Sequence, residues 1–160
     1  MRAIAYAVMF TLSAISLSVS AMPSSINPPG EKVIIVDPNE HAWGAYAPNG
    51  ALVRQGVAST GADFCPDMGT QCHTQEGSFR IRSLGSAGCT SPTFPMPNGG
   101  GPMPYCMYFN DLQALHGYPH VSSTRNASHG CVRMNVGDAR WVRYNFAQVG
   151  TLVVVKPYYN

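Results

Sequence analysis

The sequence carries little charge of either sign. Its 160 residues include 10 lysines and arginines against 8 aspartates and glutamates, so the formal charge at pH 7 is only +2. There is also no long basic tract and no platform of interleaved aromatic and basic residues, which are features of nucleic-acid-binding surfaces. We therefore expect no nucleic-acid partner.

Long apolar runs are missing too, with one exception at the N-terminus. Residues 3–17 are uncharged and largely apolar, they follow Met1 and Arg2, and small residues lead from them to Ala21. This pattern is typical of a secretory signal peptide. A membrane anchor is the alternative, but the run is shorter than the ~20 residues that a spanning helix needs.

Internal repeats and a second domain are likewise absent from the sequence. We expect a signal peptide over residues 1–21, a linker over 22–32 and one domain, the catalytic domain, over 33–160. After cleavage the protein would have no stable membrane span. Its predicted location is outside the cytoplasm, either periplasmic or secreted and associated with the cell wall.

The number of cysteines is odd, which matters for an exported chain because thiols pair in oxidising compartments. Cys65 and Cys72 bracket a short turn-rich stretch, and Cys89 and Cys106 flank a long loop rich in proline and glycine. Four cysteines allow three pairings, and sequence does not choose among them. We favour the two local disulfides, which leave Cys131 as the free thiol.

Short β-branched or alternating apolar stretches predict a mainly-β sandwich or barrel-like domain. The expected strands cover residues 32–37, 41–47, 51–59, 77–85, 103–109, 112–117 and 151–156. One late helix is predicted after Asn135, because apolar residues recur from Val136 to Phe146 at steps of three and four. Asn135 would cap this helix and Gly150 would end it.

The candidate chemistry lies in the stretch SHGCVRM, residues 128–134. A cysteine thiol needs a nearby base to act as a nucleophile on a carbonyl carbon. The possible bases for Cys131 are His116, His120 and His129. Cys131 and these three histidines are also conceivable zinc ligands. Their one compact pair, the H-x3-H of His116 and His120, is a weak match, because Gly117 and Pro119 lie within it and disfavour a helix. A purely structural cysteine is the third possibility.

With HG at His116 and Gly117 ahead of it, the motif SHGCVRM resembles the signature of the L,D-transpeptidase catalytic domain family. The likeness extends over residues 33–155, through NGALVRQGVASTG, TQEGSFRI, MPYCMYF and DARWVRYNFAQVGTLVVV. The resemblance implies an L,D-transpeptidase-like β-sandwich or barrel with one helix near the active site. It implies no metal and no cofactor.

The resemblance also implies roles for particular residues. Cys131 would be the nucleophile, His116 its base, and the Gly117 carbonyl would orient the imidazole. The oxyanion environment and substrate-binding wall would include Ser128, His129, Gly130 and Arg133. The arginines of the last third of the chain would suit a substrate with a carboxylate.

The implied activity is that of a cysteine acyltransferase acting on peptidoglycan stem peptides. It would form a thioester with a tetrapeptide stem, release the terminal D-alanine and pass the acyl group to an acceptor amine. A carbapenem would form an adduct on the same sulfur. The alternatives are an L,D-carboxypeptidase on the same scaffold, which uses water, and a non-catalytic wall-binding module.

Overall fold

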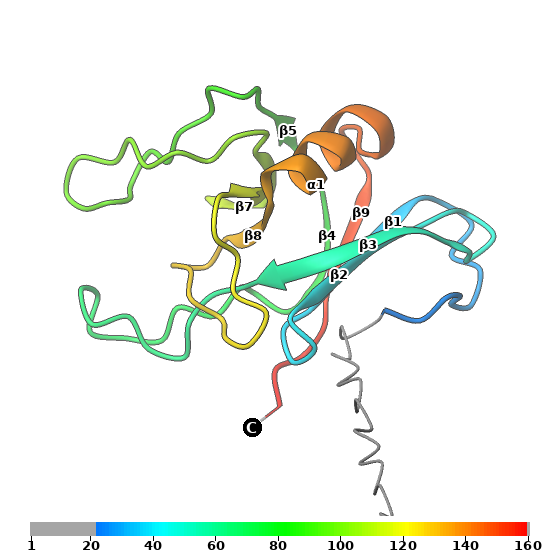
Figure 1. Ribbon diagram of the computed structural model, residues 1–160, viewed down its shortest axis with the longest axis horizontal. Helices are drawn as coiled ribbons and strands as arrows, with labels where there is room; N and C mark the ends of the chain where they lie inside the picture. The colour runs from blue at the N-terminus through cyan, green and yellow to red at the C-terminus, as the bar shows by residue number, and fades with distance from the viewer. Residues whose placement is uncertain (1–21, 160) are drawn as a thin grey trace, which may run out of the picture.

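The computed structural model describes residues 22–159, so the predicted signal peptide lies outside the described residues. Within them, nine strands form one curled sheet in the order β4-β9-β1-β2-β3-β8-β7-β6-β5 (Figure 1). The strands are β1 (Val33–Asp37), β2 (Ala42–Tyr46), β3 (Leu52–Ser59), β4 (Gly77–Arg80), β5 (Ser83–Leu84), β6 (Met107–Asn110), β7 (Gln113–Tyr118), β8 (Val132–Asn135) and β9 (Leu152–Val155). The predicted mainly-β fold is confirmed, as a half-barrel with a single short helix among these residues.

The core fills the inside of the curl. Alternation along β1 turns Ile34 and Val36 inward, where they meet Trp43 of β2 in one buried cluster. That cluster also takes residues from β3, β6, β7, β8, β9 and the helix. Across it, the rings of Phe79 on β4 and Phe109 on β6 lie 5.5 Å apart, so the sheet nearly closes on itself.

The helix begins where predicted, after Asn135, but it ends before Gly150. α1 (Val136–Trp141) continues directly into a π-helical segment, η1 (Val142–Phe146), and the chain becomes extended at Ala147. The expectation that Gly150 ends the helix is therefore wrong. The Ala147 N–H donates to the Val142 carbonyl and closes the last turn, while Gly150, with φ of +94°, shapes the turn before β9. Asn135 precedes the helix but makes no capping bond through its side chain.

The stretch expected as one strand over residues 77–85 is divided in two. β4 pairs with β9, whereas β5 pairs with β6 at the opposite end of the sheet. Between them Ile81 turns into the core, where it is 1% exposed. The break allows one short stretch to join both ends of the curled sheet.

Residues 22–32 are those that we expected to be a linker. The first of them pack against the domain. The buried Met22 packs with Val33 and Tyr46 in a second cluster, on the outer face of the sheet. The Tyr46 hydroxyl donates to the Pro23 carbonyl at 2.9 Å, and the Ile26 N–H donates to a carbonyl of the β2–β3 turn. This segment shields apolar surface that the sheet would otherwise expose.

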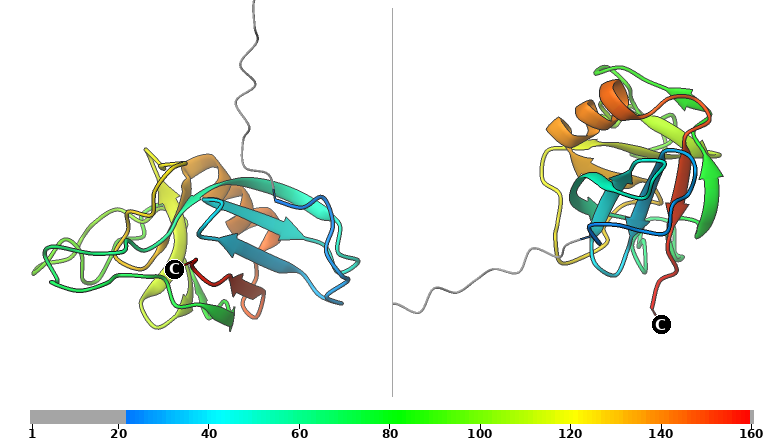
Figure 2. Two further views of the ribbon diagram at one scale, coloured as in Figure 1. Left: turned by 90° about the horizontal axis from the view of Figure 1, so that it is seen from below. Right: turned by 90° about the vertical axis from the view of Figure 1, so that its right-hand side faces the viewer.

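Two long loops project from the same side of the sheet (Figures 1 and 2). We call residues 60–76, between β3 and β4, the first loop and residues 85–106, between β5 and β6, the second loop. The expected disulfides are present: Cys65–Cys72 closes the first loop and Cys89–Cys106 the second. None of the helical segments found between residues 22 and 159 is long and apolar enough to cross a bilayer.

Candidate active site

The site is built on the pairing of β7 with β8. Of these two strands, the sequence pattern predicts β7 but not β8. The two strands run parallel, with Leu115 opposite Val132 and His116 opposite Arg133. Because side chains alternate along a strand, Leu115 and Val132 enter the core while His116 and Arg133 face the other way. Cys131, one residue before β8, falls on the same face as His116.

A cavity of about 390 Å³ opens on this face. The second loop supplies one wall and the β6–β7 turn another, while β7 and the segment leading into β8 supply the floor. The lining residues are Ser91, Pro92, Thr93, Phe94, Pro95, Gly101, Pro102, Met103, Leu112, Gln113, His116, Tyr118, Ser128, His129, Cys131 and Arg133. Five of the seven residues expected at the site therefore line one cavity.

Cys131 is the free cysteine of the part of the chain that the structure describes. Its thiol donates a hydrogen bond to the Leu112 carbonyl at 3.6 Å rather than to an imidazole. Burial raises the pKa of this thiol, and a hydrogen bond from the Ala114 backbone and the charge of Arg133 oppose that effect only in part. The resting sulfur is therefore a protonated thiol at neutral pH.

His116 is buried in the cavity floor, with 4% of its surface exposed. Burial lowers the pKa of its imidazole from 6.5 to about 4, with Arg133 adding to the effect and a hydrogen bond to Gly117 opposing it. Nδ1 lies 2.9 Å from the Gly117 carbonyl oxygen, which accepts only, so Nδ1 carries the proton. The imidazole is neutral at pH 7, and Nε2 is its proton acceptor.

Ser128 and Gly130 brace the turn that carries the thiol. The Ser128 hydroxyl donates to the Cys131 carbonyl at 2.5 Å and accepts the Gly130 N–H at 3.1 Å. Gly130 itself has φ of +110°, a conformation that disfavours any residue with a side chain. Because Ser128 occupies the Gly130 amide, that amide is not a free oxyanion donor in this structure.

Arg133 is held by two contacts on the cavity face. Its guanidinium lies over the Tyr118 ring, 4.1 Å from the ring centre, and donates to the Ala127 carbonyl at 2.9 Å. Its positive charge favours the thiolate of Cys131 and disfavours the imidazolium of His116. Sequence reasoning missed Tyr118, although its position two residues after His116 in a strand places both on one face.

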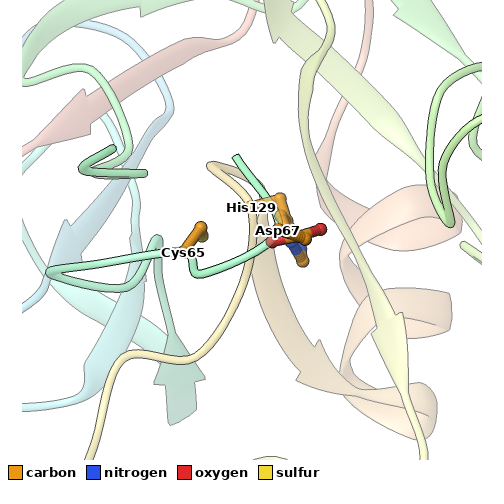
Figure 3. Close-up of side chains that lie close together, drawn as sticks. All are labelled: Cys65, Asp67 and His129. Carbon is orange, nitrogen blue, oxygen red and sulfur yellow. The ribbon is translucent and has the colours of Figure 1, made fainter. Parts of the chain in front are cut away.

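His129 lies at the rim of the cavity rather than beside the thiol. Its ring pairs with Asp67 of the first loop, as Figure 3 shows, and stacks on Phe94 of the second loop. Neither partner was expected from the sequence, because both come from loops without a recognisable motif.

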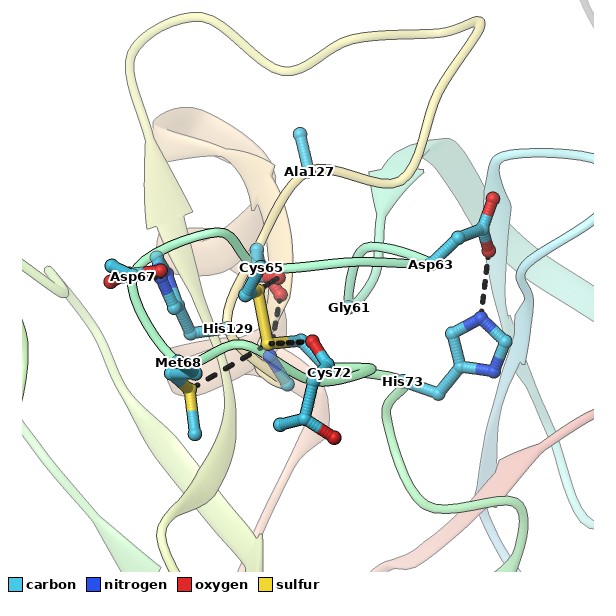
Figure 4. The surroundings of a disulfide bond; sticks show 12 residues. Gly61, Asp63, Cys65, Asp67, Met68, Cys72, His73, Ala127 and His129 are labelled. Carbon is cyan, nitrogen blue, oxygen red and sulfur yellow. Dashed lines mark hydrogen bonds and ion pairs between the residues drawn. A yellow bond between two sulfur atoms is a disulfide. The ribbon is translucent and has the colours of Figure 1, made fainter.

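The four residues considered as zinc ligands are not gathered into one cluster. Among residues 22–159, the sole grouping of three ligand-type side chains is Cys65, Asp67 and His129, whose ligand atoms lie within 4.8 Å of one another. The Cys65 sulfur is bonded to Cys72 (Figure 4) and is no thiolate. As the structure stands, this grouping offers a carboxylate and an imidazole that are already paired with each other.

Comparison with known proteins places this geometry in a family context. The family model of the L,D-transpeptidase catalytic domain matches residues 31–155. No curated protein sequence gives a significant match.

Among solved structures, an L,D-transpeptidase from Xylanimonas cellulosilytica superposes with a TM-score of 0.66 at 22% identity, covering 82% of this chain and 63% of that one. One from Mycobacterium smegmatis gives 0.65 at 23% identity, covering 79% and 59%. L,D-transpeptidase 3 from Mycobacterium tuberculosis, with a faropenem-derived adduct, gives 0.63 at 21% identity, covering 79% and 60%. The chain thus spans about six tenths of these solved chains, and the likeness establishes a shared fold.

Proposed function

Because the chain belongs to the L,D-transpeptidase catalytic domain family, we propose that it is a cysteine L,D-transpeptidase acting on peptidoglycan stem peptides. One observation carries this proposal. The free thiol of Cys131, just before β8, and the neutral imidazole of His116 on the adjacent parallel strand β7 face one cavity. The proposal extends to an exported, wall-associated protein whose signal peptide ends at Ala21, and its two disulfides fit an oxidising compartment.

The first half-reaction begins from an uncharged pair. The Cys131 sulfur attacks the carbonyl of the L-centre residue of a tetrapeptide stem while its proton passes to Nε2 of His116. The hydrogen bond from the thiol to Leu112 must be exchanged for one to the imidazole before this transfer. The carbon–nitrogen bond to the terminal D-alanine then breaks, the leaving amine takes the proton from His116, and a thioester remains.

Gly117 and Arg133 support these steps in different ways. The Gly117 carbonyl holds Nδ1–H, so the imidazole presents Nε2 to the cavity in the required tautomer. Arg133 places a half-buried positive charge at the cavity, which favours both the thiolate that forms during attack and a substrate carboxylate. The Tyr118 ring holds the guanidinium at the cavity through a cation–π contact.

In the second half-reaction an acceptor amine attacks the thioester. His116 removes a proton from this amine, the carbon–sulfur bond breaks, and the thiol recovers its hydrogen. Water in place of the amine would make the protein an L,D-carboxypeptidase. Digests of purified stem peptides separate the two, because transfer gives cross-linked dimers and hydrolysis gives shortened monomers.

Intact mass after incubation with imipenem tests the nucleophile. We expect the wild type to gain the mass of one ring-opened imipenem and Cys131→Ala to gain none. His116→Gln should keep the sulfur but form the adduct at least ~100-fold more slowly, as expected for loss of a general base. An adduct on Cys131→Ala, or none on the wild type, would contradict the proposal.

A further inference from the structure

The imidazole of His129 joins the two disulfide-closed loops across the mouth of the cavity. Its Nε2 lies 2.9 Å from both carboxylate oxygens of Asp67 on the first loop. Its ring stacks on Phe94 of the second loop, with centroids 4.3 Å apart and planes inclined by 27°. Both loops project in the same direction (Figures 1 and 2), and His129 contacts both of them. His129 and Phe94 line the cavity, whereas Asp67 contacts His129 without lining the cavity.

We infer that Asp67 is a positioning residue, which fixes the His129 ring against Phe94 and thereby holds Gly130 and Cys131 in place for acyl transfer. The inference rests on the proposed function, because it assigns Asp67 a part in the chemistry of Cys131. Asp67 does not itself touch the cavity.

The covalent path from the His129 ring to the thiol is short. Only Gly130 separates the two residues, and a glycine at φ of +110° has no side chain to anchor it. The Ser128 hydroxyl holds this turn from within, through bonds to Gly130 and Cys131. The contacts of His129 with Asp67 and Phe94 hold it from outside, and both partners belong to other segments of the chain.

The first loop is hydrogen-bonded to the residues before the thiol, and this fixes the position of the segment that carries Asp67. The Ala62 N–H donates to the Ser128 carbonyl, and the Cys72 N–H donates to the Ala62 carbonyl. The Cys65–Cys72 disulfide then closes the short loop that carries Asp67. The hydrogen bond from His129 lowers the pKa of the Asp67 carboxyl, so this partner stays ionised at neutral pH.

A matched control exists on the same loop. Asp63 pairs with His73 at 2.7 Å in the same kind of carboxylate–imidazole contact (Figure 4). His73 stacks on Tyr158 and does not line the cavity, and the Asp63 side chain is 90% exposed. Asp63→Ala therefore removes the same kind of carboxylate–imidazole contact at a place outside the cavity that holds Cys131.

The experiment measures the rate of imipenem acylation at saturating inhibitor for the wild type, Asp67→Ala, Asp67→Asn and Asp63→Ala. We expect Asp67→Ala to be slower by about fivefold, the effect of losing one partly exposed hydrogen bond to a carboxylate. Asp67→Asn, which keeps an acceptor oxygen, should recover part of the rate. Asp63→Ala should stay within about twofold of the wild type, because its contact with His73 lies outside the cavity.

Two further readouts separate positioning from general stability and from the proposed function. The NMR signal of the His129 ring proton at Cε1 should shift in Asp67→Ala, because the ring leaves the face of Phe94, and should not shift in Asp63→Ala. The rate of alkylation by iodoacetamide measures the reactivity of the Cys131 thiol and requires no peptide or β-lactam chemistry.

Equal acylation rates for Asp67→Ala and the wild type, or an unchanged His129 signal, would overturn the inference. So would equal slowing in the two alanine variants. A wild type that forms no imipenem adduct would instead refute the proposed function. In that case, the positioning of Cys131 by Asp67 would still be supported if the alkylation rate and the His129 signal changed in Asp67→Ala and not in Asp63→Ala.

Discussion

The buried imidazole of His116 gives the protein a specific dependence of stability on pH. In the folded protein the pKa of this group is about 4, against 6.5 for an ordinary histidine. Between these two values the unfolded chain binds a proton that the folded protein does not. The free energy of unfolding therefore falls as the pH falls from 6.5 towards 4, and the loss is complete once both states are protonated.

The size of the loss follows from the difference between the two pKa values. One pH unit corresponds to about 1.4 kcal/mol, so the imidazole should remove ~3 kcal/mol from the free energy of unfolding between pH 7 and pH 4. This is a large part of the roughly 10 kcal/mol that is typical of a small domain. The pKa of buried Asp37 is also lowered, but its contribution is lost below its ordinary value of 3.8, outside this window.

Urea unfolding at a series of pH values, for the wild type and for His116→Gln, isolates this contribution. The two proteins share every other titrating group, so the difference between their unfolding free energies reports on the imidazole alone. We expect that difference to change by ~3 kcal/mol from pH 7 to pH 4, with the wild type losing more. A difference that stays constant over this range would refute the assignment of a buried, neutral imidazole. The neutral-pair mechanism would then fail with it.

Three further predictions concern the support of the site. Tyr158→Phe removes a hydroxyl that donates to Thr60 Oγ1 at 2.8 Å and accepts the Thr74 N–H at 3.0 Å. Urea unfolding should show that the free energy of unfolding falls by about 1–2 kcal/mol. The control Tyr159→Phe, at an exposed position, should show no loss. Gly61→Ala would place a methyl carbon 1.8 Å from the Cys72 carbonyl oxygen, so we expect little folded protein by circular dichroism, and a native spectrum would contradict this. Reduction of both disulfides should lower the free energy of unfolding by about 5 kcal/mol in the chain-entropy model, and an unchanged urea midpoint would disprove it.

Much of the framework was predictable because its signals are local. The strands around β1, the β2–β3 hairpin and β9 follow from β-branched runs and a glycine turn, which depend on neighbours in sequence. The strand β8 was missed because only four residues form it and their pattern is hidden inside the motif SHGCVRM. The apolar spacing from Val136 to Phe146 matches α1 and the π-helical segment together, but the end of the helix was misplaced at Gly150, because the chain already becomes extended at Ala147.

The roles of the two loops were not predictable in the same way. Their composition indicates turns and local disulfides, and those disulfides are present. Nothing in the sequence indicates that Asp67 and Phe94 meet at His129, since these contacts join residues 35 and more positions apart through irregular backbone. Contacts of this kind leave no periodic signal.

The sequence by itself determined the motif, the odd cysteine and the mainly-β fold class, because each depends on residue type, number or short-range spacing. Only the tertiary structure decided that Cys131 and His116 face one cavity, since this follows from the parallel register of β7 and β8. It also decided the ionisation of the pair. A pKa depends on burial and on charges brought close by folding, and a linear sequence contains neither.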